Sequence, residues 1–534
     1  MTSADMIVTN GRIYTVDPAQ PWAEAMACRD CRILALGSNL DIRSLAGPDT
    51  KHFDASNHLI LPGFVDAHVH FLQYALRRQQ ISLFGLSDFN QVRQRIASAV
   101  QQAQPGQWII GWGWDENPWN IQPNAGHLDE IAPYNPVVLA RMDMHTWWVN
   151  TVVLKLAHID RETVDPPESL IERDDAGNPT GLLREWNAIA LVERLIPEPD
   201  SSTQFTWMQE ALAEAHQLGL TGFHDQRVER EGEQSLRLFQ TLRREGLLRH
   251  RVHVNIAAGF LAETAALGLQ PGFGDELLWL GHMKAFADGT MGSLTALMLQ
   301  PFTNTSENLG LAVTGKDQLW ELALQAGEAG FPLSVHAIGD RAVRDILDVF
   351  SELETVNSAL DLAMPHRIEH VQLIHPEDLG RLAQHNIVAS VQPVHIQTDW
   401  ATVDRIWGER ARTAYAFRSL LNHGTRIAFG SDAPVAPLNP LLGIYSAITR
   451  KDAAGQPDGG WYPKEQLTLA EAIHAYTREP AYLSGKSFLS GSLSPGKWAD
   501  FILLSQNLFE IPPAAIAETT VEQTFFAGQL LFSR

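Results

Sequence analysis

The chain is poor in cysteine and has no long apolar run, and each absence excludes a class of protein. Only 2 of its 534 residues are Cys, so a disulfide scaffold is excluded. No apolar run approaches the ~18 residues that a membrane-spanning helix needs. A signal peptide is not expected, because the amino terminus reads Met-Thr-Ser-Ala-Asp-Met-Ile-Val, without a basic or a long apolar region. We therefore expect a cytoplasmic protein that does not associate with membranes.

Positive charge is also scarce. The 40 Lys and Arg against 62 Asp and Glu give a net charge of −22, which repels nucleic acids and anionic lipids. Charged residues make up 19% of the chain, below the roughly 25% of an average soluble protein, so much of the chain should be buried core. The length fits about three to four domains, or one large barrel with additions.

The two cysteines, Cys28 and Cys31, form a Cys-x-x-Cys pair. No second pair completes a thiolate metal site, and Arg29-Asp30 between them is typical of a turn joining two β-prone runs. We interpret them as incidental thiols.

Both ends of the chain have the residue pattern of β-strands. Near the amino terminus, two β-prone runs are joined by Asn10-Gly11, a dipeptide that predicts a hairpin turn. Similar runs cover residues 500–504 and 524–532. Because a lone hairpin is only marginally stable in water, the two ends are expected to pack together. We predict one discontinuous β-sandwich domain, residues 1–58 and 485–534.

Between the two ends, short apolar runs alternate with helical patterns. Eight such runs cover residues 63–70, 221–226, 251–257, 282–289, 333–339, 366–372, 388–392 and 426–432. Repeated β-then-α units imply a parallel sheet with helices outside it, and eight of them fit a closed barrel. The predicted fold class is therefore α/β, with a (β/α)8 TIM barrel over residues 59–71 and 206–484.

The first connection between barrel strands is much longer than the others. About 150 residues separate His70 from Thr221, where one helix would be enough. We predict an inserted domain at residues 72–205, which should roof the active site because loops after barrel strands lie on that face. It contains seven of the 15 Trp: Trp108, Trp112, Trp114, Trp119, Trp147, Trp148 and Trp186. Most are expected in its own core, and some in an aromatic pocket.

Side chains that bind metals recur at the ends of the predicted barrel strands. His68 and His70 lie two residues apart in the first strand, so their imidazoles point the same way. The pair alone is weak support for a metal site, because 20 His in the chain will produce chance pairs. Four other strands add polar residues to the same face: Lys284, His336, His370 and Asp432. Together these six residues predict a site on one face of the barrel.

Lys284 lies inside the apolar fourth strand, where an uncompensated charge is costly to bury. One interpretation is a salt-bridged structural lysine. The other is a carbamate, formed with carbon dioxide, whose two oxygens bridge two metals.

Five motifs surround these residues, and a sixth follows the barrel. They are 61–70 (Leu-Pro-Gly-Phe-Val-Asp-Ala-His-Val-His), 284–293 (Lys-Ala-Phe-Ala-Asp-Gly-Thr-Met-Gly-Ser), 334–342 (Ser-Val-His-Ala-Ile-Gly-Asp-Arg-Ala), 367–370 (Arg-Ile-Glu-His), 429–434 (Phe-Gly-Ser-Asp-Ala-Pro) and 491–500 (Gly-Ser-Leu-Ser-Pro-Gly-Lys-Trp-Ala-Asp). Over essentially the whole chain, the sequence resembles the amidohydrolase superfamily, specifically its N-substituted formamide deformylase-like (YtcJ-like, amidohydrolase family 3) branch. Leu294 departs from the branch, which often has Arg there, and this bears on substrate detail rather than on metal binding.

The resemblance implies a distorted barrel with two divalent metals. In it, His68 and His70 hold the more buried metal with Asp432, His336 and His370 hold the second, and carbamylated Lys284 bridges both. Imidazole and carboxylate ligands without thiolate favour zinc, with manganese, iron or cobalt as alternatives.

The resemblance also implies hydrolysis of a C–N bond in a small-molecule amide, N-formyl or N-acyl, by a metal-activated hydroxide. Asp432 would act as general base and then general acid. Asp66 would be a hydrogen-bond partner behind the ligands, or an ordinary strand residue.

Substrate contacts are predicted with a structural alternative for each. The candidates are His145, Trp114, Asp115, Asp288 and Arg341, with Glu185 ranked below them. His145 resembles a motif of the branch and would orient the carbonyl or the leaving group.

Other classes of function fit less well. A glycosidase with paired carboxylates would not need four His and a Lys at strand ends. A catalytically inactive metal-binding protein would be expected to lose a ligand or the base. Within the enzyme class, the alternative is a deaminase or cyclic-amide hydrolase of the same superfamily. A homodimer is the default expectation for the oligomeric state.

Overall fold

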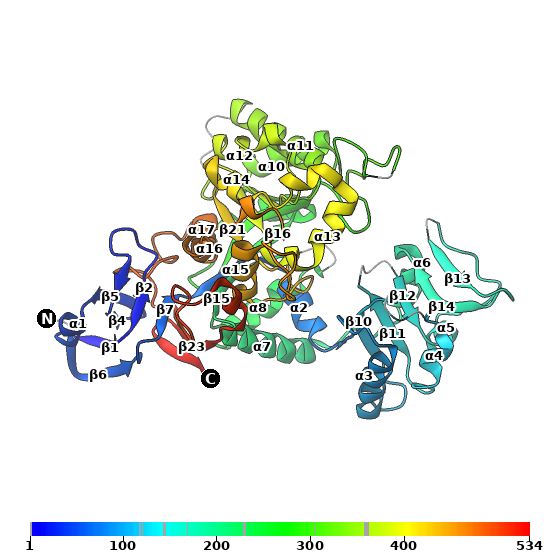
Figure 1. Ribbon diagram of the computed structural model, residues 1–534, viewed down its shortest axis with the longest axis horizontal. Coiled ribbons are helices and arrows are strands. Elements are labelled where there is room, and N and C mark those ends of the chain that lie inside the picture. The colour runs from blue at the N-terminus through cyan, green and yellow to red at the C-terminus, as the bar shows by residue number, and fades with distance from the viewer. Residues whose placement is uncertain are drawn as a thin grey trace. The chain divides into compact units, whose positions relative to one another are not determined.

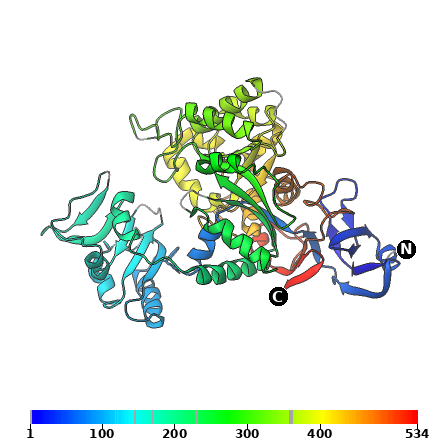
Figure 2. The same cartoon turned by 180° about the vertical axis from the view of Figure 1, so that it is seen from behind.

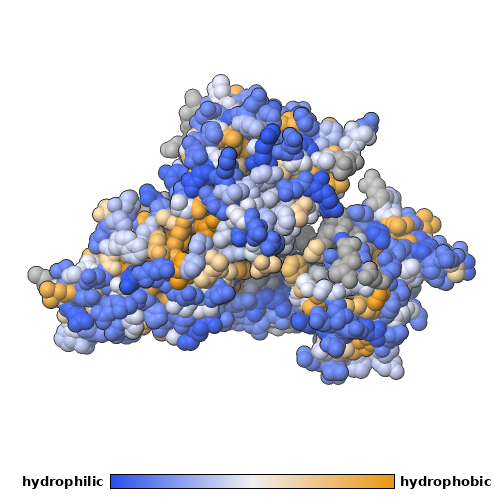
Figure 3. All heavy atoms as spheres, viewed as in Figure 1, coloured by the Kyte–Doolittle hydropathy of each residue, from blue (hydrophilic) through white to orange (hydrophobic). Residues whose placement is uncertain are grey.

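The computed structural model describes residues 3–116, 119, 121–142, 146–167, 169–227, 231–303, 305–356 and 362–534. The chain forms two compact units, Met1–Tyr74 with Met208–Arg534, and Ala75–Trp207 (Figures 1 and 2). Among the described residues, no helix is long and apolar enough to cross a bilayer. The face drawn in Figure 3 is mostly hydrophilic, as expected when the apolar side chains are collected in cores.

The centre of the first unit is an eight-stranded parallel sheet. Its order is β21 (Ile427–Phe429), β20 (Val388–Val391), β19 (Arg367–His370), β18 (Leu333–Ala337), β17 (Leu278–Phe286), β16 (Arg251–Ala257), β15 (Leu220–Gln226) and β8 (Phe64–Val69). A parallel bridge between Val69 and Ala433 brings the first and last strands together, so the barrel is nearly closed. All eight strands predicted from the apolar runs are confirmed.

Helices follow the strands and cover the outside of the sheet (Figure 2). They are α8 (Gln234–Arg244), α9 (Leu261–Ala266), α10 (Lys316–Glu328), α11 (Asp340–Val356), α12 (Arg381–Gln384), α13 (Ile396–Trp407), α14 (Phe417–Asn422), α15 (Pro440–Thr449), α16 (Leu469–Ala475) and α17 (Arg478–Leu483). α2 (Phe71–Arg77) and α7 (Ser201–Gln217) flank the second unit in sequence. In α11, apolar residues at helical spacing, such as Val343, Ile346, Leu347 and Phe350, are buried and the other face is polar.

The two ends of the chain contribute to two further sheets of the same unit. One has the order β24 (Gln529–Ser533), β23 (Val521–Phe526), β22 (Phe501–Leu504), β7 (Leu59–Pro62), β2 (Arg12–Tyr14) and β3 (Trp22–Ala23). The other has the order β5 (Arg32–Gly37), β4 (Ala25–Arg29), β1 (Ala4–Thr9) and β6 (Ala46–Asp54), beside which lies α1 (Asn39–Arg43). One apolar cluster joins the two sheets, with Met6 and Met26 from one and Ile60, Phe501 and Phe525 from the other. The chain ends therefore meet in one core, seen in Figure 1 as blue strands beside red ones.

The hairpin predicted at Asn10-Gly11 is wrong. β1 and β2, on either side of it, belong to different sheets and do not pair with each other. The backbone N–H of Asn10 donates to the side chain of Asn39 (2.7 Å), and a Cβ at Gly11 would lie 2.9 Å from Ile60 Cδ1. The dipeptide thus carries the chain from one sheet to the next, and a larger residue at position 11 would require the Ile60 side chain to shift. A tight turn does join β4 to β5, at Asp30 and Cys31, which leaves Cys28 buried and Cys31 exposed as free thiols.

The second unit contains a six-stranded mixed sheet. Its order is β13 (Leu170–Arg173), β14 (Pro179–Arg184), β12 (Thr146–Val149), β11 (Val137–Arg141), β10 (Ile109–Trp114) and β9 (Ile81–Ser82), and its helices are α3 (Phe89–Gln102), α4 (Ala125–Asp129), α5 (Thr151–Leu156) and α6 (Trp186–Glu193). Trp114, Trp119 and Trp148 are buried in one apolar cluster of this unit, and Trp147 in another. These tryptophans form its core.

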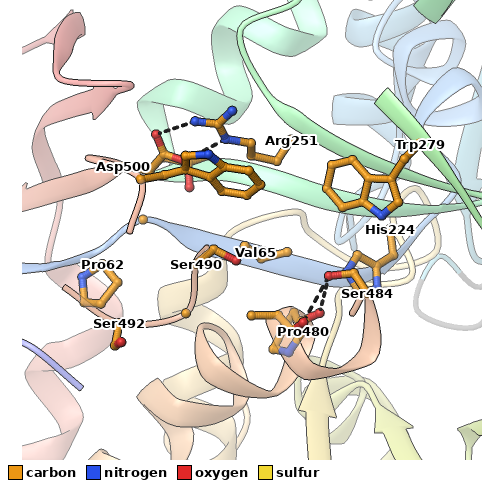
Figure 4. Close-up of a pocket in the computed structure, with 15 residues that line it drawn as sticks. Pro62, Val65, His224, Arg251, Trp279, Pro480, Ser484, Ser490, Ser492 and Asp500 are labelled. Carbon is orange, nitrogen blue, oxygen red and sulfur yellow. Dashed lines mark hydrogen bonds and ion pairs between the residues drawn. The ribbon is translucent and has the colours of Figure 1, made fainter. Parts of the chain in front are cut away.

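A small cavity lies at the amino ends of the barrel strands (Figure 4). Gly63, Thr221, Arg251 and Trp279 line it from the starts of four strands or just before them, together with residues 480–500. It holds about 30 Å³, room for roughly two water molecules and far below the ~300 Å³ of a ligand pocket. This end of the barrel is therefore structural.

Candidate metal centre

The carboxyl ends of the barrel strands bring together the residues that the sequence singled out. Nε2 of His68 and Nε2 of His70 lie 3.2 and 3.3 Å from the same oxygen of Asp432, Oδ1. The ring centroids of His68 and His370 are 4.9 Å apart, and those of His336 and His370 are 4.5 Å apart. These side chains come from strands one, five, six and eight, so only the closed barrel assembles them.

Three of the imidazoles are each fixed through one ring nitrogen. Nδ1 of His68 lies 2.6 Å from Oε2 of Glu369, Nε2 of His336 lies 3.0 Å from the Gly289 carbonyl oxygen, and Nδ1 of His370 lies 2.8 Å from Oε1 of Gln392. Because each partner is an acceptor, the ring nitrogen facing it carries the proton and donates. The opposite nitrogens of His336 and His370, Nδ1 and Nε2, keep a lone pair, as a metal ligand requires. Nε2 of His68 lies 3.2 Å from Oδ1 of Asp432, and although burial lowers the pKa of His68, the carboxylates of Glu369 and Asp432 outweigh burial and raise it.

Glu369 anchors His68 from inside the barrel. It also accepts hydrogen bonds from Ser334 Oγ (2.6 Å) and from the guanidinium of Arg367, and all four side chains are buried. Burial alone would raise the pKa of Glu369, but Arg367 and His68 hold it well below its usual range. The carboxylate therefore stays ionised and keeps the imidazole of His68 in one orientation.

Lys284 is buried with little compensation for its charge. Its Nζ has no hydrogen-bond partner and no ion pair among the described residues, and its cation–π contact is with Phe286, whose ring centroid is 4.7 Å away. Burial lowers the pKa of Lys284 to about 8, against the opposing influence of Glu369 and Asp432. The amine is therefore substantially neutral near pH 8, which is the nucleophilic form. The salt-bridged interpretation of this lysine finds no partner in the described part of the chain.

Asp432 and Asp66 join the first strand to the last. The backbone N–H of Asp432 donates to the His68 carbonyl (2.7 Å), and Asp66 accepts from the N–H groups of His68 (2.9 Å) and Ser431 (3.1 Å). Burial raises the pKa of Asp66 to about 6. Asp432 and His370 have φ of 59° and 73°, a left-handed conformation that is strained for these residues and is typical of functional sites.

Asp288 supports the loops around His336. Its carboxylate accepts from the backbone N–H groups of Leu297, Ile338 and Gly339 at 2.8 to 3.0 Å, and Oδ1 lies 3.5 Å from His336 Nε2. Burial outweighs these hydrogen bonds and raises its pKa to about 7. The contacts described for Asp288 thus support the surrounding backbone, and its contact with a substrate stays a prediction.

The other predicted substrate contacts have varied surroundings. Arg341 is half-exposed and pairs with Asp345 on its own helix (2.7 Å). Trp114 is 1% exposed, and its Nε1 donates to the Leu139 carbonyl (2.8 Å). Asp115 lies 3.3 Å from Arg141, while His145 lies outside the described residues. Glu185, at the start of α6, has φ of 67°. Substrate contact by these residues stays a prediction.

Three residues near the metal centre were missed in the sequence: Glu369, Gln392 and His395. The signals were present. Arg367 and Glu369 are opposite charges two residues apart in an apolar strand, so they share a face. Gln392 and His395 follow strand seven, from which no candidate was taken.

The donor set fits a divalent metal. His68, His370 and Asp432 each offer a ligand atom within 4.8 Å of one another, and Nζ of Lys284 is buried without a hydrogen-bond partner among the described residues. Buried polar atoms without partners are costly, and a bound cation would satisfy those with a lone pair. A metal site at the carboxyl ends of the strands of a parallel barrel is the arrangement of a metal-dependent barrel enzyme.

Comparison with known proteins gives the family. A family model described as the amidohydrolase family matches residues 51–532, and the chain belongs to this family. The putative amidohydrolase YtcJ of Bacillus subtilis (strain 168) is 30% identical over 98% of both chains. An N-substituted formamide deformylase of Arthrobacter pascens is 27% identical over 99% of this chain and 98% of its own. The protein LONG AFTER FAR-RED 3 of Arabidopsis thaliana is 35% identical over 99% of this chain and 92% of its own.

Two solved structures are also similar. An uncharacterized metal-dependent hydrolase from Pyrococcus furiosus has a TM-score of 0.76 and 27% identity, covering 95% of this chain and 99% of its own. A metal-dependent hydrolase from Pyrococcus horikoshii has a TM-score of 0.78 and 25% identity over the same shares. The resemblance inferred from the motifs is confirmed, and the protein is a metal-dependent hydrolase of the amidohydrolase family.

Proposed function

We propose that the protein hydrolyses the C–N bond of a small-molecule amide, N-formyl or N-acyl, at a centre of two divalent metals, with zinc favoured. The observation that carries this proposal is the convergence of four His, one buried neutral-prone Lys and one Asp on one end of the barrel. The similarity to an N-substituted formamide deformylase supports the amide substrate.

The residues divide into two ligand sets. His68, His70 and Asp432 would hold one metal, and His336 and His370 the other, through the ring nitrogens left free by Glu369, Gly289 and Gln392. Lys284 would bridge them as a carbamate: its neutral Nζ adds to carbon dioxide, the new N–C bond forms and one proton leaves. A carbamate suits this position because it replaces an unpartnered amine with two oxygen donors.

When bound, divalent metals polarise a carbonyl and lower the pKa of water from 15.7 to about 7. Asp432 accepts a proton from the attacking water as oxygen bonds to the acyl carbon. As the C–N bond breaks, its electron pair stays on nitrogen and Asp432 returns the proton there, giving an acid and an amine. Burial alone would raise the pKa of Asp432, but the neighbouring histidines hold it well below its usual range, so the carboxylate is ionised and can accept the proton.

The finer organisation is part of the same proposal. We propose that the two terminal sheets form a β-sandwich of residues 1–58 and 485–534, that residues 59–71 and 206–484 form the barrel domain, and that the insertion, residues 72–205, roofs the site with some of its tryptophans facing the substrate. We also propose that the protein is a cytoplasmic homodimer that binds neither nucleic acids nor membranes.

The test combines metal analysis with one variant. Protein grown in metal-replete medium should carry about two divalent metals per chain, and chelation should abolish hydrolysis of N-formyl and N-acyl amines. Asp432→Asn should retain at least one metal and lose about 10³- to 10⁴-fold in kcat, the upper range for general acid–base catalysis. No metal in the wild type, or normal turnover in the variant, would reject the proposal.

A further inference from the structure

His395 lies on the active face but has no role in the metal sets. Strand β20 ends at Val391, and the chain continues through Gln392 into a short 3-10 turn, Pro393–His395, from which α13 begins. The N–H of His395 donates to the Gln392 carbonyl (3.1 Å), and Gln392 holds His370. One short segment therefore fixes both a proposed ligand and His395.

The imidazole of His395 is buried with an unused nitrogen. Its side chain is 8% exposed, and Nε2 has no hydrogen-bond partner among the described residues. The nearest carboxylate oxygen is Oδ2 of Asp432 at 3.9 Å, beyond hydrogen-bond distance. Oδ1 of Asp432 faces His68 and His70, whereas Oδ2 faces His395. Oδ2 of Asp432 and Nε2 of His395 are thus neighbouring polar atoms on the active face, and Nε2 is almost fully shielded from solvent.

A single substrate atom can lie within hydrogen-bond distance of both Asp432 Oδ2 and His395 Nε2. Two atoms 3.9 Å apart leave no room for a third on the line between them, but an atom off that line can lie about 2.9 Å from each. Asp432 returns its proton to the departing nitrogen, so that nitrogen must come within reach of the carboxylate. The same position is within reach of His395.

We propose that Nε2 of His395 accepts a hydrogen bond from the N–H of the substrate amide and selects amides that carry such a hydrogen. The inference rests on the proposed function and deepens it. The lone pair that develops on the departing nitrogen receives the proton from Asp432, so only the N–H is left to contact His395. The ring proton of His395 then lies on Nδ1. N-monosubstituted formamides and other amides with an N–H are substrates, and N,N-disubstituted amides are rejected because they leave Nε2 unpaired.

The experiment compares two matched probes, N-(2-phenylethyl)formamide and its N-methyl derivative, with metal-loaded full-length protein. The wild type should favour the N–H probe by at least about 100-fold in kcat/KM. His395→Leu, which lacks an acceptor, should lower that ratio at least tenfold, and His395→Gln, which supplies an amide oxygen, should restore part of it. Metal content and thermal melting of each variant verify the fold.

A matched control is His250→Leu. His250 is buried, and neither ring nitrogen has a hydrogen-bond partner in the described part of the chain, but it precedes β16 at the other end of the barrel. This variant should keep the wild-type ratio. An equal loss on both probes in His395→Leu would overturn the inference, because the contact would then not involve the N–H.

Binding provides an independent readout. The affinity of the metal-loaded protein for 2-phenylethylamine, measured by calorimetry, should fall at least fivefold in His395→Leu and recover in His395→Gln. If the wild type carries two metals and hydrolyses neither probe, the amide function fails while this binding comparison still decides the contact. An unchanged Kd in His395→Leu would refute it.

Discussion

Each end of the barrel buries a basic side chain, and the surroundings of the two side chains differ. At the amino end, Arg251 Nε donates to Asp500 Oδ2 (2.9 Å), its Nη2 lies 3.3 Å from Oδ1, and its guanidinium stacks on Trp498 at 3.8 Å. At the carboxyl end, Lys284 is also buried, and among the described residues it has no hydrogen bond or ion pair of this kind.

This difference separates stability from function. The Arg251–Asp500 pair joins the barrel to the residue before β22, so it ties the barrel to the terminal sheet, and both charges are compensated. In the part of the chain that the structure describes, Lys284 has no such pair, so its amine stays costly to bury until it reacts, as in the proposed carbamate. The paired arginine thus serves stability, whereas the unpaired lysine belongs to the proposed metal centre.

Replacing Lys284, at the carboxyl end of the barrel, should give the largest effect on activity. Lys284→Met should lower kcat/KM by about 10³-fold or more, since one metal interaction contributes several kcal/mol. The metal-free variant should melt no lower than metal-free wild type, because it removes an uncompensated amine. Lys284→Ala should recover part of its activity with added short carboxylic acids. Full activity in either variant would rule out the carbamate.

Replacing Arg251, at the amino end of the barrel, should lower stability and leave activity unchanged. Arg251→Met leaves Asp500 buried without its partner and should lower the free energy of unfolding by about 3 to 5 kcal/mol, measured by urea denaturation. Metal content and kcat of the folded fraction should stay at wild-type values. The double variant Arg251→Met with Asp500→Leu should recover most of the stability. A loss of bound metal in Arg251→Met would contradict the idea that the amino end of the barrel contributes only to stability.

A smaller effect is expected at Gln392, which orients the proposed ligand His370 but does not itself hold a metal. Gln392→Leu removes the acceptor for Nδ1 of His370 and should weaken metal affinity by 10- to 100-fold, measured by competition with a chelator. Gln392→Glu, which keeps an acceptor oxygen, should stay close to wild type. Equal affinity in all three proteins would show that His370 needs no support.

The smallest effect concerns two stacked histidines near the amino end, His216 and His250, with ring centroids 3.9 Å apart. Burial lowers the pKa of His216 to about 4 and that of His250 well below its usual value. Between pH 6.5 and 4 the unfolded chain binds more protons, so stability falls with falling pH, by about 1.4 kcal/mol per pH unit for each such histidine. In the metal-free protein, His216→Gln should flatten this acid limb of the unfolding free energy. A slope identical to wild type would contradict the assignment.

Much of the barrel could be predicted because its information is local. Each strand is a short apolar run, and a strand buried on both faces needs little else. Polar residues at the ends of such runs, among them His336 and His370, indicate where the candidate metal site lies. The register of these ends follows from parallel pairing, so the six predicted residues share one face.

What could not be predicted depends on contacts between distant segments. The turn at Asn10-Gly11 has a hairpin sequence, yet β2 finds a better partner in β7, some 45 residues away. Glu369 meets His68 across 301 residues, and Arg251 meets Asp500 across 249. A local pattern can mark Glu369 as a buried charge beside Arg367, but it cannot identify His68 as its partner, so the supports of the site were harder to predict than its candidate ligands.

The seam between β8 and Asp432 has a consequence for how the protein is made. His68 and Asp432 are 364 residues apart (432 − 68), and they are joined by the bond from the Asp432 N–H to the His68 carbonyl. At a ribosomal rate of roughly 5 to 20 residues per second, His68 waits roughly 20 to 70 s for its partner to be synthesised. A metal site that needs both residues, as in the proposed function, can therefore be completed only after Asp432 has been synthesised.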